Sequence, residues 1–439
     1  MEKRRAYGLT TSISMIVGIV IGSGIFFKAD DILKSTSGNV GLGMLALTLG
    51  AMAIIFGSLT ISEFATRSDR NGGLVDYFEK FVSNKAAGGF GTFQTLIYYP
   101  TVNVIVSYAS SIYLTIVLGI KVSFELQILI AYLIFVFILI MNIISRRVGG
   151  YFQNITAIIK LIPLILVAIL GFTSKSVSYE VTNNVSFNSN ISWIAALAPI
   201  TFSYDGWPIS TTIAGEVKAP KKNMPIALTI APIIILISYL LFFYGVTNIL
   251  EINAIMELSD GYLNYIFVSL FGNSAGKILT ILVFIAIVGV VNGLSLAGIR
   301  MPQALSERNI LFSKSVQKIN PKYQISIKSS IIYFIICSIW MLLHYVITKY
   351  GLLNNSDISE IAVAFSYITY IILYVKVISM HRKGEIKGIF RGIISPLLAI
   401  ATALFVTFGA LSINFVNVII YIVFCAIVFI IGYAVTGRK

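Results

Sequence analysis

Two short segments, about 180 residues apart, contain residue types that can present backbone polar groups inside an apolar environment. The first is Gly22-Ser23-Gly24-Ile25, within an otherwise apolar run. Its glycines let the chain leave helical geometry without a Cβ clash. The N–H groups of Ser23, Gly24 and Ile25 can then point into a cavity at the start of a second half-helix. Such a terminus carries partial positive charge and suits a carboxylate.

The second segment is Phe202-Ser203-Tyr204-Asp205-Gly206-Trp207-Pro208. Pro208 lacks an N–H and clashes with a preceding carbonyl, so carbonyls near Tyr204 lose their partners and suit an ammonium group. Donors from one segment and acceptors from the other match the two ends of an amino-acid zwitterion. Simple helix packing at Gly18 and Gly22, and a plain proline kink, are the alternatives.

Two charged residues lie inside apolar stretches, where a charge needs a cavity or a polar partner. Asp205 either binds the amino group or braces the unwound segment, and we favour bracing. Lys160 is a buried cation that can take the place of a coupling sodium ion, tying the fifth span to the first and the eighth. A lysine at the lipid interface on a tilted helix is the alternative for Lys160.

These residues must be positioned by membrane-spanning helices. Of the 439 residues, 57% are hydrophobic and only 11% are charged, well below the quarter that is typical of soluble domains. A helix needs roughly 20 apolar residues to cross the hydrocarbon layer. That length predicts twelve spans, with these approximate limits: 9–33, 40–64, 91–118, 124–145, 151–172, 191–214, 225–249, 276–305, 325–349, 357–380, 389–411 and 416–436. A run near 262–271 is too short and predicts a surface or re-entrant helix.

The placement of charge predicts the topology. Lys and Arg cluster in alternate loops, the positive-inside pattern, which puts both termini in the cytoplasm of a multi-pass protein of the cell membrane. The net charge of +14 is therefore a topology signal, with anionic-lipid contact as a further option, and we expect no nucleic-acid partner. Cys337 and Cys425 lie in apolar spans, so we expect no structural disulfide.

The two broken segments fall in spans one and six. An offset of five spans predicts two five-span halves of opposite orientation, about 8–172 and 191–381. Together they form a transport core over 1–381, and 382–439 adds two C-terminal helices. Two such breaks in matching halves are typical of a transporter with its substrate site at the membrane midplane. The expected fold class is an all-α membrane protein.

A family resemblance covers about residues 7–350. The chain resembles the amino acid–polyamine–organocation (APC) superfamily, and within it the L-type amino acid transporters. The motifs that resemble the family are Gly22–Phe26, Lys160, Phe202–Trp207, the Gly-Glu-Val-Lys-Ala-Pro run from Gly215 to Pro220, and Val291–Arg300 continuing to Asn309.

The resemblance implies a LeuT-like 5+5 inverted repeat and sodium-independent exchange of amino acids. It assigns the substrate carboxylate to backbone N–H groups and the amino group to backbone carbonyls. The implied substrate contacts are Gly22, Ser23, Gly24, Ile25, Phe202, Ser203, Tyr204 and Asp205. The Phe202 ring is implied to be a gate, and Lys160 and Asn292 to be coupling residues, with packing on span one as the alternative for Asn292.

Two departures from the family pattern matter. Pro208 stands where members specific for large neutral amino acids have Asn, and no cysteine occurs in Gly119–Ser123, where some members link to a glycoprotein. We therefore expect a prokaryotic-type exchanger that works without such a subunit. Small neutral L-amino acids are the expected substrates, because Ile, Phe and Tyr line the breaks and offer no partner to a charged side chain.

The alternatives are a proton-coupled symporter using Asp205 or Glu216, a cationic amino acid or polyamine antiporter, and a non-transporting sensor. His344 and His381 are isolated from any metal-ligand pattern, and no catalytic constellation or cofactor motif is present, so we expect neither metal, cofactor nor enzyme activity.

Overall fold

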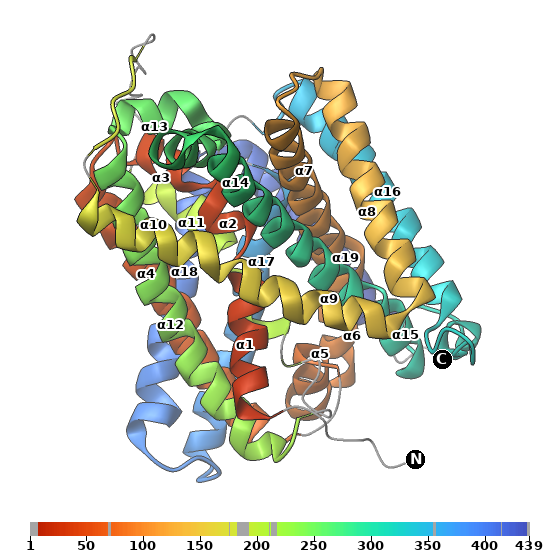
Figure 1. The fold of residues 1–439 in the computed structure, drawn as a ribbon. Coiled ribbons are helices and arrows are strands. Elements are labelled where there is room, and N and C mark those ends of the chain that lie inside the picture. Colours follow the sequence, from red (N-terminus) through yellow and green to blue (C-terminus); the bar gives the residue numbers. More distant parts are fainter. Residues whose placement is uncertain are drawn as a thin grey trace.

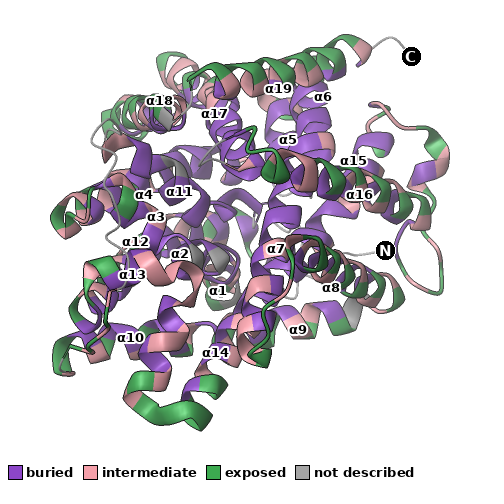
Figure 2. Ribbon diagram, turned by 90° about the horizontal axis from the view of Figure 1, so that it is seen from above, coloured by how far each residue is buried: buried purple, intermediate pink, exposed green. Residues whose placement is uncertain are grey.

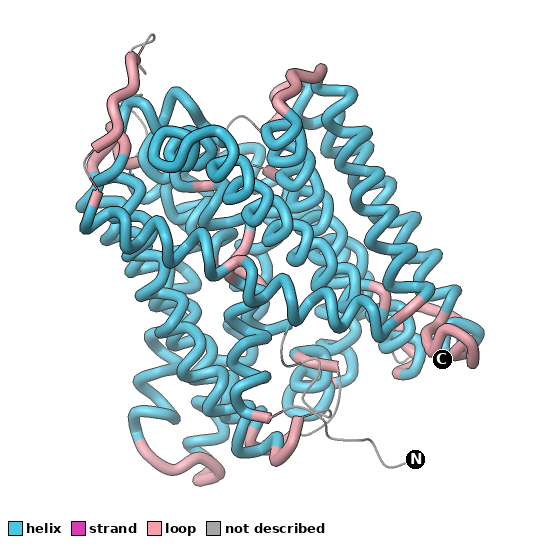
Figure 3. Tube along the Cα trace, viewed as in Figure 1, coloured by secondary structure: helices cyan, strands magenta, loops and turns pink. Residues whose placement is uncertain are grey.

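The computed structural model describes residues 8–68, 72–174, 176–181, 193–209, 211, 217–353, 357–413 and 415–436. Gly215, Glu216 and the side chain of Ser23 lie outside the described parts. Within those parts the chain is almost entirely helical (Figure 3). Among the described residues, ten helices are long and apolar enough to cross a membrane, or eleven if the bent pair near the start of the chain counts as one span. The predicted all-α membrane class is confirmed, while the count of twelve stays a prediction, since part of 191–214 lies outside the described residues.

The first half of the chain contains α1 Leu9–Val20, α2 Ser23–Phe27, α3 Ala29–Ser35, α4 Val40–Ala65, α5 Leu74–Tyr77, α6 Asn84–Phe93, α7 Tyr99–Leu118, α8 Phe124–Ile144, α9 Arg146–Ile159 and α10 Leu161–Thr173. The second half contains α11 Leu197–Ser203, α12 Pro220–Ile249, α13 Ile252–Leu258, α14 Tyr262–Gly298, α15 Arg300–Glu307, α16 Ile327–Lys349, α17 Ile358–Arg382, α18 Ser395–Ile413 and α19 Phe415–Val435. Short π-helical segments are η1 Phe78–Val82, η2 Gln94–Tyr98 and η7 Phe390–Ile394, and short 3-10 segments are η3 Trp193–Ala196, η5 Ser259–Gly261 and η6 Lys314–Gln317.

Polar residues at the ends of apolar runs fix several helix starts. Asn39 and Ser123 accept hydrogen bonds from the N–H groups of Leu42 and Leu126, at 3.0 and 3.3 Å, and so cap α4 and α8. Asp357 and Glu360 form a reciprocal capping box at the start of α17. These caps satisfy N–H groups that have no partner within their own helix.

Several observed boundaries differ from the predicted ones. The third predicted span begins at Asn84 rather than at residue 91, because Ser83 caps α6 and η2 then links α6 to α7 without a break. The apolar run near 262–271 is the first arm of α14, which bends where Gly272 adopts a φ of +78°. Only glycine enters that backbone region readily, so this residue ends the short arm.

The helices form an inner and an outer group. In the span Asn84–Leu118 and in α17, 67% of the most apolar 18-residue stretch is buried, against 17% in α19. The first two therefore belong to the core, and α19 belongs to the lipid-facing rim. Figure 2 shows the inner helices α1, α2, α11 and α17 in buried colours and green outward faces on α8, α16 and α19. The exposed rim side chains are mainly Ile, Leu, Val and Phe, as expected for contact with lipid.

Two opposite faces of the molecule frame the site. One face carries α3, α13 and the end of α7, and the other carries α5, α15 and the start of α1 (Figure 1). The unwound part of the first span lies between these faces. We call them the α3 face and the α5 face.

Candidate binding site between the broken helices

The first break lies where the sequence predicts it. Helix α1 ends at Val20, Ile21 and Gly22 are non-helical, and α2 begins at Ser23. A Cβ atom on Gly22 would lie 2.2 Å from Cγ2 of Val290, so a larger residue here would collide with α14. The break therefore depends on glycine for close packing as well as for backbone freedom.

The second break directly faces the first. Helix α11 ends at Ser203, and Tyr204, Asp205 and Gly206 form a turn. Gly206 has a φ of +95°, and a Cβ on it would lie 2.8 Å from Cγ2 of Ile19 in α1. Glycine is thus required by both conformation and space.

Gly24 and Ser203 bring the two breaks into backbone contact. A Cβ atom on Gly24 would lie only 2.3 Å from the Cα atom of Ser203. The start of α2 and the end of α11 therefore meet without an intervening side chain. This geometry places the first-turn N–H groups of one half-helix beside the last carbonyls of the other.

A small cavity of about 20 Å³ lies at this meeting point. It is lined by residues from α1, α2, α7, α14 and the second break, which are Ile19, Val20, Gly24, Val102, Val106, Phe202, Asp205, Gly206, Val290 and Leu294. Its size suffices for about one water molecule. Apart from Asp205, the lining side chains are apolar, so the cavity favours an apolar group of small volume.

Asp205 is held by a tyrosine from the third span. The Tyr98 hydroxyl donates a hydrogen bond of 2.6 Å to Oδ2 of Asp205, and both residues are buried. Tyr98 also lines a second cavity of about 20 Å³ on the side of α5 and α15, together with Leu74, Ile209 and Met301. The pair therefore stands between the central cavity and the cavity nearer the α5 face.

Tyr239 of α12 bridges the two breaks. Its hydroxyl lies 3.0 Å from the carbonyl oxygen of Val20 and 2.8 Å from that of Ser203, and it can donate to either. The Phe202 carbonyl accepts the N–H of Asp205 at 3.1 Å. Two of the carbonyls implied for an ammonium group thus already have a partner, although each oxygen keeps a second lone pair.

The structure brings most of the predicted substrate contacts to one place. Gly24, Phe202 and Asp205 line the cavity, with Gly22 and Ser203 packed directly beside it. Ile25 and Tyr204 are fully buried and do not line it. The Tyr204 ring packs against Tyr239 with ring centroids 4.9 Å apart, so its side chain supports the unwound turn.

Lys160 joins the fifth span to the first. It is fully buried at the junction of α9 and α10, and its ammonium donates a hydrogen bond to the carbonyl of Gly18 in α1. Among the described residues, no carboxylate forms an ion pair with it. This hydrogen bond joins the α9–α10 junction to α1, where Gly18 lies close to the end of the helix.

Asn292 lies in a network of buried amides. Its Nδ2 donates to the carbonyl of Gly149 at 3.0 Å and to Oε1 of Gln153 at 2.9 Å, and its Oδ1 accepts from Asn142 at 2.9 Å. These bonds connect α14 with α8 and α9. They direct the Asn292 amide to spans four and five rather than to span one.

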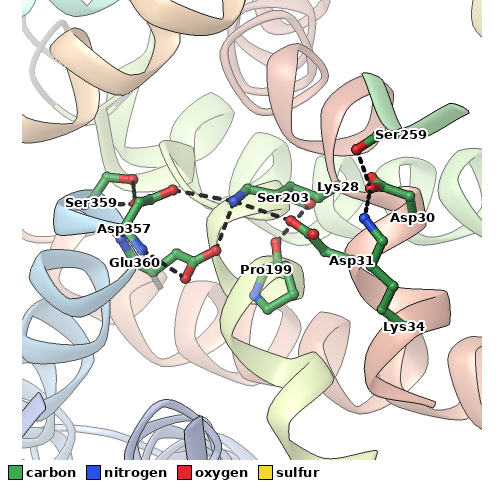
Figure 4. Close-up of polar contacts among 10 residues, drawn as sticks. All are labelled: Lys28, Asp30, Asp31, Lys34, Pro199, Ser203, Ser259, Asp357, Ser359 and Glu360. Atoms are coloured by element: carbon green, nitrogen blue, oxygen red, sulfur yellow. Dashed lines mark hydrogen bonds and ion pairs between the residues drawn. The ribbon is translucent and has the colours of Figure 1, made fainter. Parts of the chain in front are cut away.

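Lys28 is a residue near the site that was not predicted from the sequence. Its ammonium lies 2.9 Å from Glu360, 3.2 Å from Asp357 and 3.5 Å from Asp31 (Figure 4). It also lies 5.6 Å from the centre of the Phe202 ring. Lys28 therefore connects the first span to α17, close to Phe202, which lines the central cavity.

Several tyrosines were also missed. Tyr98 and Tyr239 bond to the breaks, and Tyr113 and Tyr262 both donate to the carbonyl of Phe26, at 2.8 and 3.2 Å. No spacing in the sequence distinguishes them from the other tyrosines among a total of 23. The one available signal for Lys28 was its charge within the predicted span 9–33.

Metal binding finds no support in the described part of the chain, where no group of three or more His, Cys, Asp or Glu residues is placed to hold an ion. Cys337 and Cys425 are both buried, in α16 and α19. The site is thus built from backbone groups, apolar side chains and a few paired charges.

Comparison with known proteins gives a consistent picture. A sequence model of the amino acid permease family matches residues 7–437. The serine/threonine exchanger SteT of Bacillus subtilis is 27% identical over 409 residues, which is 92% of this chain and 90% of SteT. The human b(0,+)-type amino acid transporter 1 and the human cystine/glutamate transporter are each 26% identical, over 54% and 55% of this chain and about half of their own length. All three are transporters rather than enzymes.

Proposed function

Because the chain belongs to the amino acid permease family, we propose that it is a sodium-independent exchanger of small neutral L-amino acids that works by alternating access. Amino acid transport follows from the family and its relatives. The exchange mode and the substrate class are the proposal.

The observation that supports the substrate class is the central cavity. The two broken helices meet at Gly24 and Ser203, and the space beside them is narrow and mostly apolar. A valine-lined wall formed by Val102, Val106 and Val290 leaves room for a side chain such as that of alanine or serine. The serine/threonine specificity in the name of SteT agrees with this size.

The two breaks supply complementary partners for a zwitterion. In the proposed complex the substrate carboxylate accepts N–H groups of Ser23, Gly24 and Ile25 at the start of α2. The ammonium donates to carbonyls at Phe202, Ser203 and Asp205. Tyr239 would then share the Ser203 carbonyl with the substrate, which fixes the carbonyl's direction.

Alternating access is proposed to occur by rocking of one bundle against the other around this fixed site. The core is the inverted pair 8–172 and 191–381, with 382–439 as an addition. The positive-inside pattern places the α5 face and both termini in the cytoplasm, and hence the α3 face outside. The Phe202 ring closes the cavity towards the α3 face.

Lys160 is proposed to replace a coupling cation. Its ammonium binds the Gly18 carbonyl near the unwound end of α1, where a sodium ion would otherwise compensate free carbonyls. A covalently attached charge cannot dissociate during the cycle. Transport would therefore need no sodium gradient. After it has released its substrate, the carrier would return only with another substrate bound.

Uptake of radiolabelled alanine into proteoliposomes tests this function. Vesicles are prepared with and without unlabelled alanine or serine inside, at equal pH and without sodium. Exchange predicts uptake into preloaded vesicles alone. Equal uptake into empty vesicles would contradict obligatory exchange, and a lack of uptake into either would contradict transport of small neutral amino acids.

Asp205 supports a second candidate, a proton-coupled or cation-selective transporter, because its carboxylate lines the central cavity. A cationic substrate would pair with this carboxylate, and a symporter would protonate it. Competition by arginine or putrescine, or uptake into empty vesicles driven by a pH gradient, would favour this candidate. Glu216, the other predicted proton carrier, lies outside the described residues.

A further inference from the structure

We propose that a separate cavity at the α3 face binds the primary ammonium group of a small organic cation. The cavity has a volume of about 260 Å³, far larger than the central one. Asp30, Asp31, Asp260 and Asp357 line it, together with Lys28 and His344. They come from the start of α3 with the residue before it, from η5, from α16 and from the start of α17. Ile105 and Tyr108 add α7, so the cavity lies where five segments of the chain meet.

The charges around this cavity are not balanced. Five carboxylates, those of Asp30, Asp31, Asp260, Asp357 and Glu360, surround two ammonium groups. Lys28 pairs with three of the carboxylates, and Lys34 lies 2.6 Å from Asp30 (Figure 4). At formal charges, the carboxylates therefore outnumber the ammonium groups by three. In a partly enclosed space such an excess attracts a cation more strongly than it would in bulk water.

Two buried polar atoms that belong to the cavity lining lack partners. Within the described chain, neither Oδ1 of Asp30 nor Nε2 of His344 has a hydrogen-bond partner, although the residues are only 2% and 4% exposed. The other Asp30 oxygen accepts from Ser259 at 2.8 Å and from Lys34. A buried polar atom without a partner is costly. An ammonium group brings three donors, which can satisfy the Asp30 oxygen and, in the tautomer with the proton on Nδ1, the His344 nitrogen.

The lining favours an organic cation over a metal ion. Ile105, Tyr108 and Ile347 form an apolar part of the wall, and the Tyr108 ring packs edge-on against His344 with centroids 5.0 Å apart. Among the described residues, no three side chains of His, Cys, Asp or Glu are placed together so that they could hold a metal ion. A ligand with an ammonium head and a short carbon skeleton fits both parts of the wall.

The position of Lys28 relates this outer cavity to the central one. Lys28 lines the outer cavity, and its ammonium lies over the Phe202 ring, which lines the central cavity. A bound ammonium group would compete with Lys28 for Asp31 and Asp357. If the ligand is the transported amino acid, which rests on the proposed function, the cavity is a first capture site outside the Phe202 gate.

Asp260→Asn tests the site, because Asp260 lines the cavity and forms no ion pair or hydrogen bond that the described structure records. Glu251→Gln is the matched control: it removes an exposed carboxylate from the same face, outside the cavity lining. We expect Asp260→Asn to raise the external KM for alanine exchange roughly threefold or more, with internal KM and Vmax unchanged. Adding Asp31→Asn should raise it further, and thermal melting confirms that each variant folds.

A binding measurement separates this proposal from the proposed function. Equilibrium binding of radiolabelled propylamine to the purified protein in lipid nanodiscs should be saturable in the wild type, weaker in Asp260→Asn and unaffected in Glu251→Gln. Such binding without alanine exchange would sustain the cavity proposal while the exchanger proposal fails.

The two measurements also identify the source of the ammonium group. A change in propylamine binding without a change in external KM would assign the site to a non-transported amine. Changes in both would assign it to the transported substrate. If Asp260→Asn matches Glu251→Gln in both measurements, the proposal is wrong.

Discussion

The hydroxyl of Tyr98 donates a 2.6 Å hydrogen bond to Oδ2 of Asp205, which joins the third span to the break in the sixth. Asp205 lines the central cavity and Tyr98 lines the cavity nearer the α5 face. Their bond therefore forms part of the partition that a substrate must pass on its way towards that face. A charge-assisted hydrogen bond of this kind is stronger than a neutral one.

Replacement of Tyr98 by Phe should slow exchange several-fold, because the buried Asp205 carboxylate loses a donor at a cost of about 1–3 kcal/mol. The measurement is the rate of alanine exchange per folded molecule. The effect should not add to that of Asp205→Asn, since both variants remove the same hydrogen bond. Tyr204→Phe is the control, because the Tyr204 hydroxyl has no partner among the described residues. Additive effects of Tyr98→Phe and Asp205→Asn would argue against the partition role.

Gly24→Ala should weaken binding of the substrate. The new methyl group would lie 2.3 Å from the Ser203 Cα atom, so the two broken helices would be pushed apart. We expect alanine binding, measured by equilibrium dialysis, to fall at least about tenfold, a loss of about 1.4 kcal/mol. Gly150→Ala in α9 has open space around the new methyl group and should leave binding unchanged. Normal affinity in Gly24→Ala would show that the contact between the breaks is dispensable.

Lys160→Ala should give a folded protein that exchanges slowly or asymmetrically. The change removes the side chain that links the α9–α10 junction to the Gly18 carbonyl and leaves that carbonyl without this donor. External and internal KM, measured in oriented proteoliposomes, should diverge from the wild-type ratio. Lys277→Ala removes an exposed lysine from α14 and serves as the control. Wild-type turnover in Lys160→Ala would refute the role proposed for this charge.

Asn292→Ala should reduce stability more than it reduces exchange by the molecules that remain folded. Three buried hydrogen bonds between α14, α8 and α9 are lost, and each unsatisfied partner costs about 1–3 kcal/mol. Thermal melting and exchange per folded molecule separate the two effects. Asn248→Ala, which loses a single 3.2 Å bond to Gly171, should melt much closer to the wild type. The reverse pattern, with normal melting and lost exchange, would make Asn292 a coupling residue.

Local sequence was enough to locate the breaks and the class of the protein. Gly22, Gly206 and Pro208 leave an apolar helix few other conformations, because glycine permits the required backbone angles and proline removes a donor. The length of each apolar run is likewise a local property that the bilayer thickness converts into a span. Predicted helix boundaries were wrong where a polar residue outside the apolar run caps a longer helix, as Ser83 does for α6.

The partners of the site were decided by tertiary structure alone. Tyr98 bonds to Asp205, 107 positions away along the chain, and Tyr239 bonds to Val20, 219 positions away. Lys28 pairs with Glu360, 332 positions away. Hydropathy and spacing describe which face of a helix is apolar, but they do not state which helix it meets or at what depth. The sequence by itself therefore determined where the backbone must open, whereas packing of distant helices decided how small the cavity is and which charges surround it.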